Sequence, residues 1–293
     1  MSAPLLTVEG LRVGFQAANG GVIEAVRGVD FSIASGEAVG IVGESGSGKS
    51  LSMLAVMRLL GAPARPTGGR ILFDGEDLLA ADEARMRVLR GRDIAMVFQD
   101  PQSSLNPALT IGRQITDVVR AHRKVSAGEA RAIAAEALAR VGIREASKRL
   151  DAYPHEFSGG MRQRALIAMA IACRPRLLIA DEPTTALDVT IQKQILDLLV
   201  RLQEEYGMGL IMITHNMGVV AETADRVIVQ YKGRKMEEAD VLSLFESPKS
   251  NYTRALLSAL PDNATGDRLP TIDGFLMEAE SSAIVAPMME PPL

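Results

Sequence analysis

Hydrophobic and polar positions alternate with a period of two over the first forty residues, and the period then changes. Four alternating segments, 5–8, 11–15, 22–26 and 29–33, predict strands, with turns at Gly20-Gly21 and Ser35-Gly36. The segment 37–42, which is apolar after Glu37, predicts a short buried strand. Leucine and methionine then recur at helical spacing from residue 51 to residue 60, which predicts a helix directly behind that strand.

Helical spacing dominates from about residue 99 to residue 175, where Ala, Arg and Glu are prominent. Ser126 followed by Glu129 predicts a capping box ahead of the helical run 130–141. Strand patterns return at 177–180, 210–214 and 227–229, with an amphipathic helix at 191–202 between the first two. Strands that alternate with helices favour a largely parallel sheet, so we expect an α/β core interrupted by a helical insertion.

Composition limits the possible functions. The 293 residues carry a formal net charge of −4 with charges of both signs interspersed, which argues against a nucleic-acid partner. The single cysteine, Cys173, excludes an internal disulfide, and the three histidines are not at metal-ligand spacing. We expect no secretory signal and no membrane span, because the longest apolar stretches fall far short of about 20 residues. The chain is therefore expected to be cytoplasmic and to reach a membrane only through a partner.

The strongest motif is the segment 43–50, which reads G-E-S-G-S-G-K-S between the buried strand and its helix. In such a phosphate loop the backbone N–H groups surround phosphate oxygens, and the helix N-terminus adds a favourable dipole. Lys49 is expected to reach the β- and γ-phosphates of ATP, and the Ser50 hydroxyl to ligate Mg²⁺. The expected ATP-binding residues here are Gly43, Ser45, Gly46, Ser47, Gly48, Lys49 and Ser50.

Polar side chains at the ends of predicted strands supply candidate catalytic groups. Asp181 is expected to contact Mg²⁺, and Glu182 to position or deprotonate the attacking water, the two pointing to opposite sides as neighbours on a strand do. His215 would hydrogen-bond the γ-phosphate, and Gln99 would contact both Mg²⁺ and the water. Taken alone, each has an ordinary alternative: a solvated acidic turn, a surface histidine or a helix cap.

Two further features concern ATP. Phe15 either stacks on adenine or is a buried strand residue, and the sequence does not distinguish these alternatives. Ser158, Gly159 and Gly160 open a helix expected to run from Met161 to Cys173, so its first N–H groups form a second anion site. Two such sites, far apart in sequence, can hold one nucleotide between two subunits. S-G-G alone is also a common Ser-capped helix start.

The order of these motifs resembles that of the ATP-binding cassette ATPases over residues 5 to about 260. The resemblance implies an α/β fold: a P-loop NTPase core with an N-terminal antiparallel β-subdomain (1–98 and 176–260) and an inserted α-helical subdomain (99–175). It also implies a head-to-tail ATPase dimer, in which Ser158 to Gly160 grip the γ-phosphate at the partner's loop and Asp188 links the two sites. Residues 261–293 are expected to form a loosely ordered tail.

A narrower likeness lies in the segments 42–50, 98–107 and 180–190, which are similar to the ATPase subunits of dipeptide and oligopeptide importers. That subgroup also includes importers of nickel, glutathione, sugars and opines. The resemblance implies peripheral attachment at the cytoplasmic face of the inner membrane. The implied partners are a second ATPase (a related chain or a second copy), two integral membrane permease subunits and, indirectly, an extracytoplasmic solute-binding protein. Residues 99–107 are expected to transmit motion to the permease.

The chain departs from this subgroup at several positions. Met161 stands where the wider family has Gln, Asn216 where the subgroup has Asp, and the tail lacks the cysteines of an iron–sulfur segment, so no cluster is expected. A soluble ABC ATPase of DNA repair or translation is a rival hypothesis, but the chain lacks the basic face that nucleic acid requires. A P-loop kinase leaves Ser158, Gly159, Gly160 and His215 unexplained.

Overall fold

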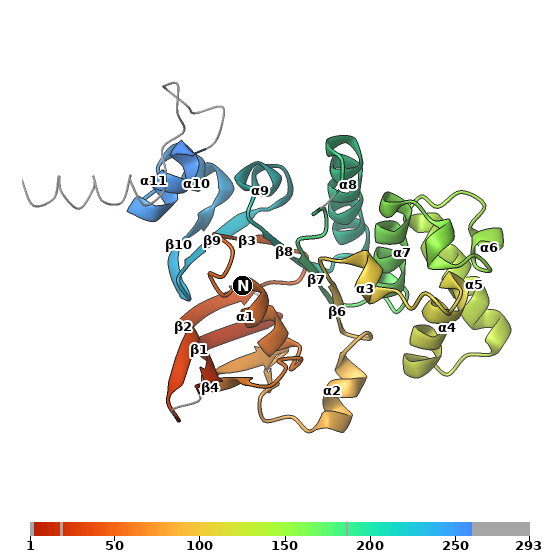
Figure 1. Cartoon of the computed structure of the whole chain (residues 1–293), viewed down its shortest axis with the longest axis horizontal. Helices are drawn as coiled ribbons and strands as arrows, with labels where there is room; N and C mark the ends of the chain where they lie inside the picture. Colours follow the sequence, from red (N-terminus) through yellow and green to blue (C-terminus); the bar gives the residue numbers. More distant parts are fainter. Residues whose placement is uncertain (1–2, 18–19, 186, 260–293) are drawn as a thin grey trace, which may run out of the picture.

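The computed structural model describes residues 3–17, 20–185 and 187–259 (Figure 1), so the expected tail at 261–293 lies outside the described residues. Two sheets form the frame. A four-stranded sheet has the order β2-β1-β4-β5, and a six-stranded sheet has the order β10-β9-β3-β8-β7-β6. The first consists of β1 Leu6–Gln16, β2 Val22–Ile33, β4 Ala64–Phe73 and β5 Glu76–Asp77. The second consists of β3 Ala38–Val42, β6 Ile94–Val97, β7 Leu177–Asp181, β8 Gly209–Thr214, β9 Arg226–Tyr231 and β10 Arg234–Asp240.

The first sheet corrects the prediction of four short strands. The paired segments are continuous, and β1 and β2 run antiparallel along their whole length, with register shifts near Gly10 and Gly28. Both glycines have positive φ, +53° and +77°, which suits the extra residue of a bulge. The bulges interrupt the alternation of polar and apolar positions without ending the strand. The pattern therefore looked like two strands where there is one.

The six-stranded sheet confirms the predicted parallel core. Strands β9, β3, β8, β7 and β6 are mutually parallel, and only β10 is antiparallel to its neighbour. Strands β3, β7 and β8 are buried at every position, as their apolar runs predict. Their carboxyl ends lie at one edge of the sheet, where ligands of open α/β folds bind.

Helices cover both faces of this sheet (Figure 1). Between the two sheets, α1 Lys49–Val56 shares a core with residues of both, among them Leu6, Ile41, Met53 and Ile179. The opposite face packs against α8 Val189–Tyr206 and the helical segment between β6 and β7. Among the described residues, the other helices outside that segment are α2 Glu83–Leu89, α9 Met217–Thr223, α10 Val241–Glu246 and α11 Asn251–Ser258.

The segment between β6 and β7 is helical, as predicted. It contains α3 Pro101–Ser104, α4 Ile111–His122, α5 Ala127–Arg140, α6 Ala146–Arg149, a 3₁₀ turn Pro154–Glu156 and α7 Gly159–Ile171. The predicted capping box is present at α5, since Ser126 and Glu129 each accept the other's backbone N–H. The helix expected at Met161 to Cys173 instead starts at Gly159, with Ser158 as its N-cap, and ends at Ile171.

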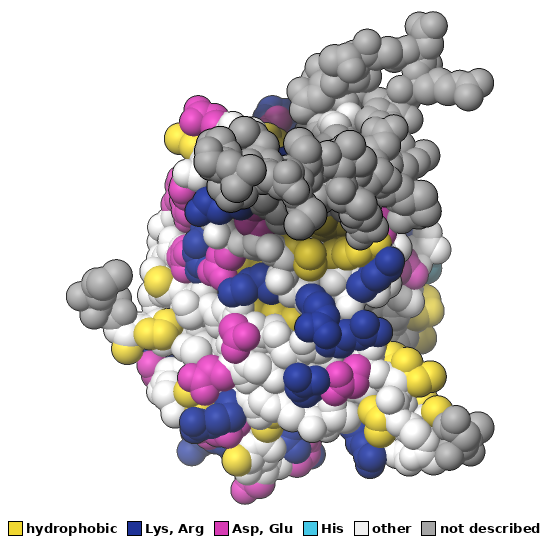
Figure 2. Space-filling view, turned by 90° about the vertical axis from the view of Figure 1, so that its left-hand side faces the viewer, with side chains coloured by type: hydrophobic (Ala, Val, Ile, Leu, Met, Phe, Trp, Pro, Cys, Tyr) yellow, Lys and Arg dark blue, Asp and Glu magenta, His cyan; other side chains and the backbone are white. Residues whose placement is uncertain are grey.

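The surface carries both signs of charge. On the face in Figure 2, basic and acidic side chains lie side by side around hydrophobic ones. Exposed ion pairs such as Arg12–Glu24, at 2.9 Å, belong to this mixed pattern. No helix in the described part of the chain is both long enough and apolar enough to cross a bilayer.

Candidate functional site

The segment 43–50 forms a loop between the buried strand β3 and the start of α1. Gly43, Gly46 and Gly48 have φ values of +151°, +79° and +96°, conformations that L side chains rarely adopt. Lys49 is buried, and its Nζ donates to the carbonyl oxygens of Gly43 at 2.7 Å and Glu44 at 2.8 Å. Burial lowers the pKa of Lys49, although the carboxylates of Glu182, Asp181 and Glu44 act in the opposite direction. The ammonium group therefore lies inside the loop.

Two expected Mg²⁺ contacts meet at the end of this loop. The Ser50 hydroxyl donates to Asp181 Oδ1 at 2.8 Å, joining α1 to the last residue of β7 across 131 positions of sequence. Burial raises the pKa of Asp181, while the Ser50 hydrogen bond lowers it. A hydroxyl and a carboxylate are the hard oxygen donors that Mg²⁺ prefers. The pair therefore fits this ion by its chemistry.

The three candidate catalytic residues converge on one carboxylate. Glu182 Oε2 accepts from Gln99 Nε2 at 2.9 Å, and Oε1 lies 3.2 Å from His215 Nδ1. These residues follow the neighbouring strands β6, β7 and β8, which explains how segments so far apart in sequence meet. Thr185, which sequence reasoning missed, donates its hydroxyl to Glu182 Oε2 at 2.9 Å.

Asp181 and Glu182 point in different directions, but the predicted cause, alternation of side chains along a strand, is wrong. Strand β7 ends at Asp181, and Glu182 has φ +44°, outside the strand region. The chain thus turns at Glu182, and this turn rather than strand alternation directs its carboxylate. Asp181 is left to face Ser50, while Glu182 faces Gln99 and His215.

The second predicted anion site is separate from the phosphate loop. Ser158 caps α7 by accepting the Met161 N–H at 3.3 Å, and Asp188 caps α8 by accepting the Ile191 N–H at 3.0 Å. A Cβ on Gly160 would lie only 2.7 Å from Ile191 Cγ2, so the two helix starts pack closely together. Among the described residues, no hydrogen bond joins either helix start to the segment 43–50 of the same chain.

Phe15 lies in β1, opposite Ile23 of β2 and Ala64 of β4. Its side chain is half-buried, and Ile23 beside it is 63% exposed. A half-buried ring at the rim of the first sheet is compatible with both alternatives, adenine stacking and strand packing.

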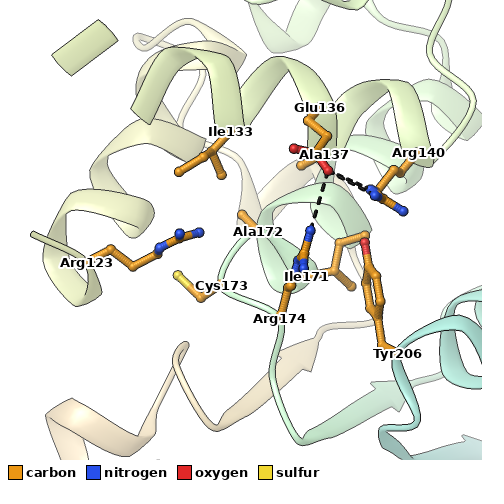
Figure 3. Close-up of a pocket in the computed structure, with 10 residues that line it drawn as sticks. All are labelled: Arg123, Ile133, Glu136, Ala137, Arg140, Ile171, Ala172, Cys173, Arg174 and Tyr206. Carbon is orange, nitrogen blue, oxygen red and sulfur yellow. Dashed lines mark hydrogen bonds and ion pairs between the residues drawn. The ribbon is translucent and has the colours of Figure 1, made fainter. Parts of the chain in front are cut away.

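A separate cavity of about 400 Å³ lies where the helical segment returns to the sheet (Figure 3). Glu136 is central to it, at 3.0 Å from Arg140 and 3.6 Å from Arg174. Both arginines also lie over the ring of Tyr206. These contacts pair Glu136 with two of the three arginines that line the cavity, and the cavity contains none of the residues predicted to bind ATP.

The loop before α1, the Ser50–Asp181 pair and the carboxylate at the strand ends define a P-loop nucleoside triphosphatase. The sequence pattern of the ABC transporter family matches residues 26–185, and the chain belongs to this family as one of its ATPases. It is 52% identical, over 93% of its length and 82% of the relative's, to a probable peptide ABC transporter ATP-binding protein of Sinorhizobium fredii. It is 50% identical, over 94% of its length and 83% of the relative's, to a putative peptide import ATP-binding protein of Brucella abortus.

Solved structures agree with this assignment. The dimeric cassette MJ0796 in a post-hydrolysis state bound to ADP and Pi superposes with a TM-score of 0.72 at 29% identity, covering 80% of this chain and 98% of that one. CbiO1 of Clostridium perfringens, part of the transporter complex cbiONQ, covers 94% of this chain with a TM-score of 0.71 at 29% identity and is itself covered completely.

Proposed function

We propose that this chain is the ATP-hydrolysing subunit of an importer that takes up peptides through partner membrane subunits. The observation that carries the proposal is the meeting of Gln99, Thr185 and His215 at Glu182, beside the Ser50–Asp181 pair. Peptide is proposed as the solute because relatives 50–52% identical to this chain are named for peptide transport or import.

In the proposed mechanism the segment 43–50 holds the phosphates of ATP with its backbone N–H groups, and Lys49 binds the β- and γ-phosphates. Ser50, Asp181 and Gln99 hold Mg²⁺, which when bound neutralises charge on the phosphates. Glu182 orients the attacking water and accepts its proton while the water oxygen bonds to the γ-phosphorus and the bond to ADP breaks. Gln99 and Thr185 hold the Glu182 carboxylate, and His215 hydrogen-bonds the γ-phosphate.

The second half of each ATP site is proposed to come from another ATPase in a head-to-tail dimer, either a related chain or a second copy. The helix start at Ser158, Gly159 and Gly160 supplies free N–H groups and a positive dipole end for the γ-phosphate on the partner's loop. Asp188, packed against this helix start through the first turn of α8, links the two sites.

The proposed docking surface for the membrane subunits is an apolar groove of about 440 Å³ between the helical segment and the core. Leu59 and Phe98 line it and remain 41% and 39% exposed, and Ser104 and Met169 face it from the helical side. Phe98 directly precedes Gln99, so movement in the groove reaches the catalytic carboxylate through one residue. This proposal includes the division into a core (1–98 and 176–260) and a helical subdomain (99–175), with the chain at the cytoplasmic face of the inner membrane.

The experiment is purification of the tagged chain from its own cells in mild detergent, followed by ATP-driven peptide uptake after reconstitution with its binding protein. We expect two membrane subunits and a second ATPase to copurify. Recovery with ribosomal or DNA-associated proteins and no membrane subunit would reject the importer assignment. Phe98→Ala should release the membrane subunits, whereas Leu242→Ala, an exposed leucine outside the groove, should not.

Glu182→Gln tests the catalytic assignment. It should lower the rate of ATP hydrolysis about 100- to 10,000-fold, the usual contribution of a general base, while ATP binding persists. Glu136→Gln is the matched control, because Glu136 pairs with arginines in the separate cavity of Figure 3. Equal hydrolysis by the two variants would remove Glu182 from its role.

A further inference from the structure

The helix α11, far from the phosphate loop in sequence, touches the loop directly. The Tyr252 hydroxyl accepts a hydrogen bond from the backbone N–H of Glu44 at 3.2 Å, across 208 positions of sequence. Tyr252 is 1% exposed and is one of the largest fully buried side chains among the described residues. Glu44 is the second residue of the loop. This contact therefore joins α11 to the backbone that is proposed to surround the phosphates.

Tyr252 is held in place from several directions. Its ring stacks on Tyr231, with ring centres 4.1 Å apart and planes inclined by 27°. Ser250 caps α11 by accepting the Tyr252 N–H at 3.2 Å. The carboxylate of Glu237, on β10, accepts the N–H groups of Lys249 at 2.8 Å and Ser250 at 3.0 Å just before the helix. The hydroxyl is thus positioned by a stacked ring, a helix cap and a buried carboxylate.

The same part of the fold supports the loop elsewhere. Gly233, in the turn between β9 and β10, donates its N–H to the Ser47 carbonyl at 3.0 Å. A Cβ on Gly43 would lie 2.0 Å from the Gln230 carbonyl oxygen, so β9 lies directly against the start of the loop. Supports from β9 and its turn therefore flank Glu44 on both sides. Tyr252 supplies the support between them, at the backbone N–H of Glu44.

We propose that Tyr252 is a positioning residue for ATP binding, which holds the Glu44 backbone so that the loop has its phosphate-binding shape before the nucleotide arrives. Ordering a loop on binding lowers affinity, because the conformational entropy is then lost at that moment. A loop held by α11 has already lost that entropy during folding. The helix α11 is in this way part of the nucleotide site, although it contacts the loop from the protein interior.

The test compares two tyrosine variants of the full-length chain by calorimetric titration with ATP and Mg²⁺. Tyr252→Phe removes the hydroxyl and keeps the stacked ring. Tyr231→Phe makes the same chemical change in the other ring of the stack, whose hydroxyl makes no hydrogen bond in the described structure. We expect the Kd for ATP to rise about 2- to 12-fold in Tyr252→Phe, the equivalent of one net hydrogen bond, and to stay within about twofold of wild type in Tyr231→Phe.

Kinetics separate positioning from general damage. In Tyr252→Phe the KM for ATP should rise while kcat at saturating ATP stays within about twofold of wild type, because the hydroxyl acts on binding and not on the catalytic carboxylate. An unchanged Kd, or a fall in kcat without a change in KM, would overturn the proposal. If Tyr252→Phe fails to fold, Glu237→Gln is used instead, because it weakens the hydrogen bonds from Lys249 and Ser250 that hold the start of α11. This variant must also raise the Kd for ATP. The inference requires only ATP binding and is therefore independent of the transported solute.

Discussion

Replacing Gly43 by Ala should destabilise the protein far more than the same change at glycines of positive φ where an added Cβ would meet open space. An added Cβ would lie 2.0 Å from the Gln230 carbonyl oxygen, more than 1 Å inside the roughly 3.3 Å at which carbon and oxygen normally meet. That carbonyl belongs to β9, which pairs with β3, so neither side can retreat without loss of sheet pairing. Backbone strain of about 1–2 kcal/mol and overpacking of about 1–3 kcal/mol together predict a loss of about 2–5 kcal/mol.

Two control glycines of positive φ show the loss expected when an added Cβ meets no other atom. Gly46 in the same loop and Gly75 in a remote hairpin have φ values of +79° and +81°, and an added Cβ meets nothing within 4 Å at either. Each alanine variant should lose only the strain, about 1–2 kcal/mol. The assay is urea unfolding of the three variants without nucleotide, followed by circular dichroism. If Gly43→Ala is no less stable than the two controls, close packing of β9 against the loop is refuted.

Three other predictions concern the frame around the site. Arg226→Met should lower the free energy of unfolding by about 1–3 kcal/mol, because it removes the half-buried ion pair with Glu37 at 2.8 Å. Urea unfolding measures the free energy, and an unchanged value in the variant would contradict the prediction. Gly112→Ala should speed hydrogen exchange in α4 and leave β3 unchanged, because its Cβ would meet the Leu150 carbonyl oxygen at 2.6 Å; unchanged exchange in α4 would refute it. Burial raises the pKa of Tyr252 to about 12, so the folded state keeps the tyrosine proton between pH 10 and 12 while the unfolded state loses it, and the free energy of unfolding falls with pH in this range. In Tyr252→Phe the free energy of unfolding, measured with urea, should fall less between pH 10 and 12. Equal falls in the variant and the wild type would contradict this.

The parts of the fold that were predictable are those where burial dictates composition. Strands β3, β7 and β8 are apolar at nearly every position, and the segment 43–50 has a spacing that few other structures require. Strand β4 was not recognised, because Arg65, Pro66 and two glycines at 68–69 interrupt any alternation along it. It is held in the sheet by pairing with β1, a tertiary contact that leaves little trace in its own sequence.

Some residues of the candidate site could be predicted from the sequence, and others could not. Gln99, Glu182 and His215 could be expected to meet, since each follows a predicted strand and parallel strands end at one edge of the sheet. Thr185 could not be inferred, because its contact depends on the turn that Glu182 makes with φ +44°. Tyr252 could not be inferred either. Its partner is a backbone N–H 208 positions away, and no side-chain pattern encodes such a contact.

The helical segment leaves and rejoins the sheet through adjacent strands, since β6 and β7 pair directly in parallel. The pairing of β6 with β7 therefore does not depend on any residue of the helical segment. Variation within the segment can accumulate, or a relative's segment can be grafted in, while the strand ends that carry Gln99 and Glu182 keep their spacing. If the membrane subunits dock on this segment, as proposed, changes in the inserted helices could alter which membrane subunit is bound without moving the strands that carry Gln99 and Glu182.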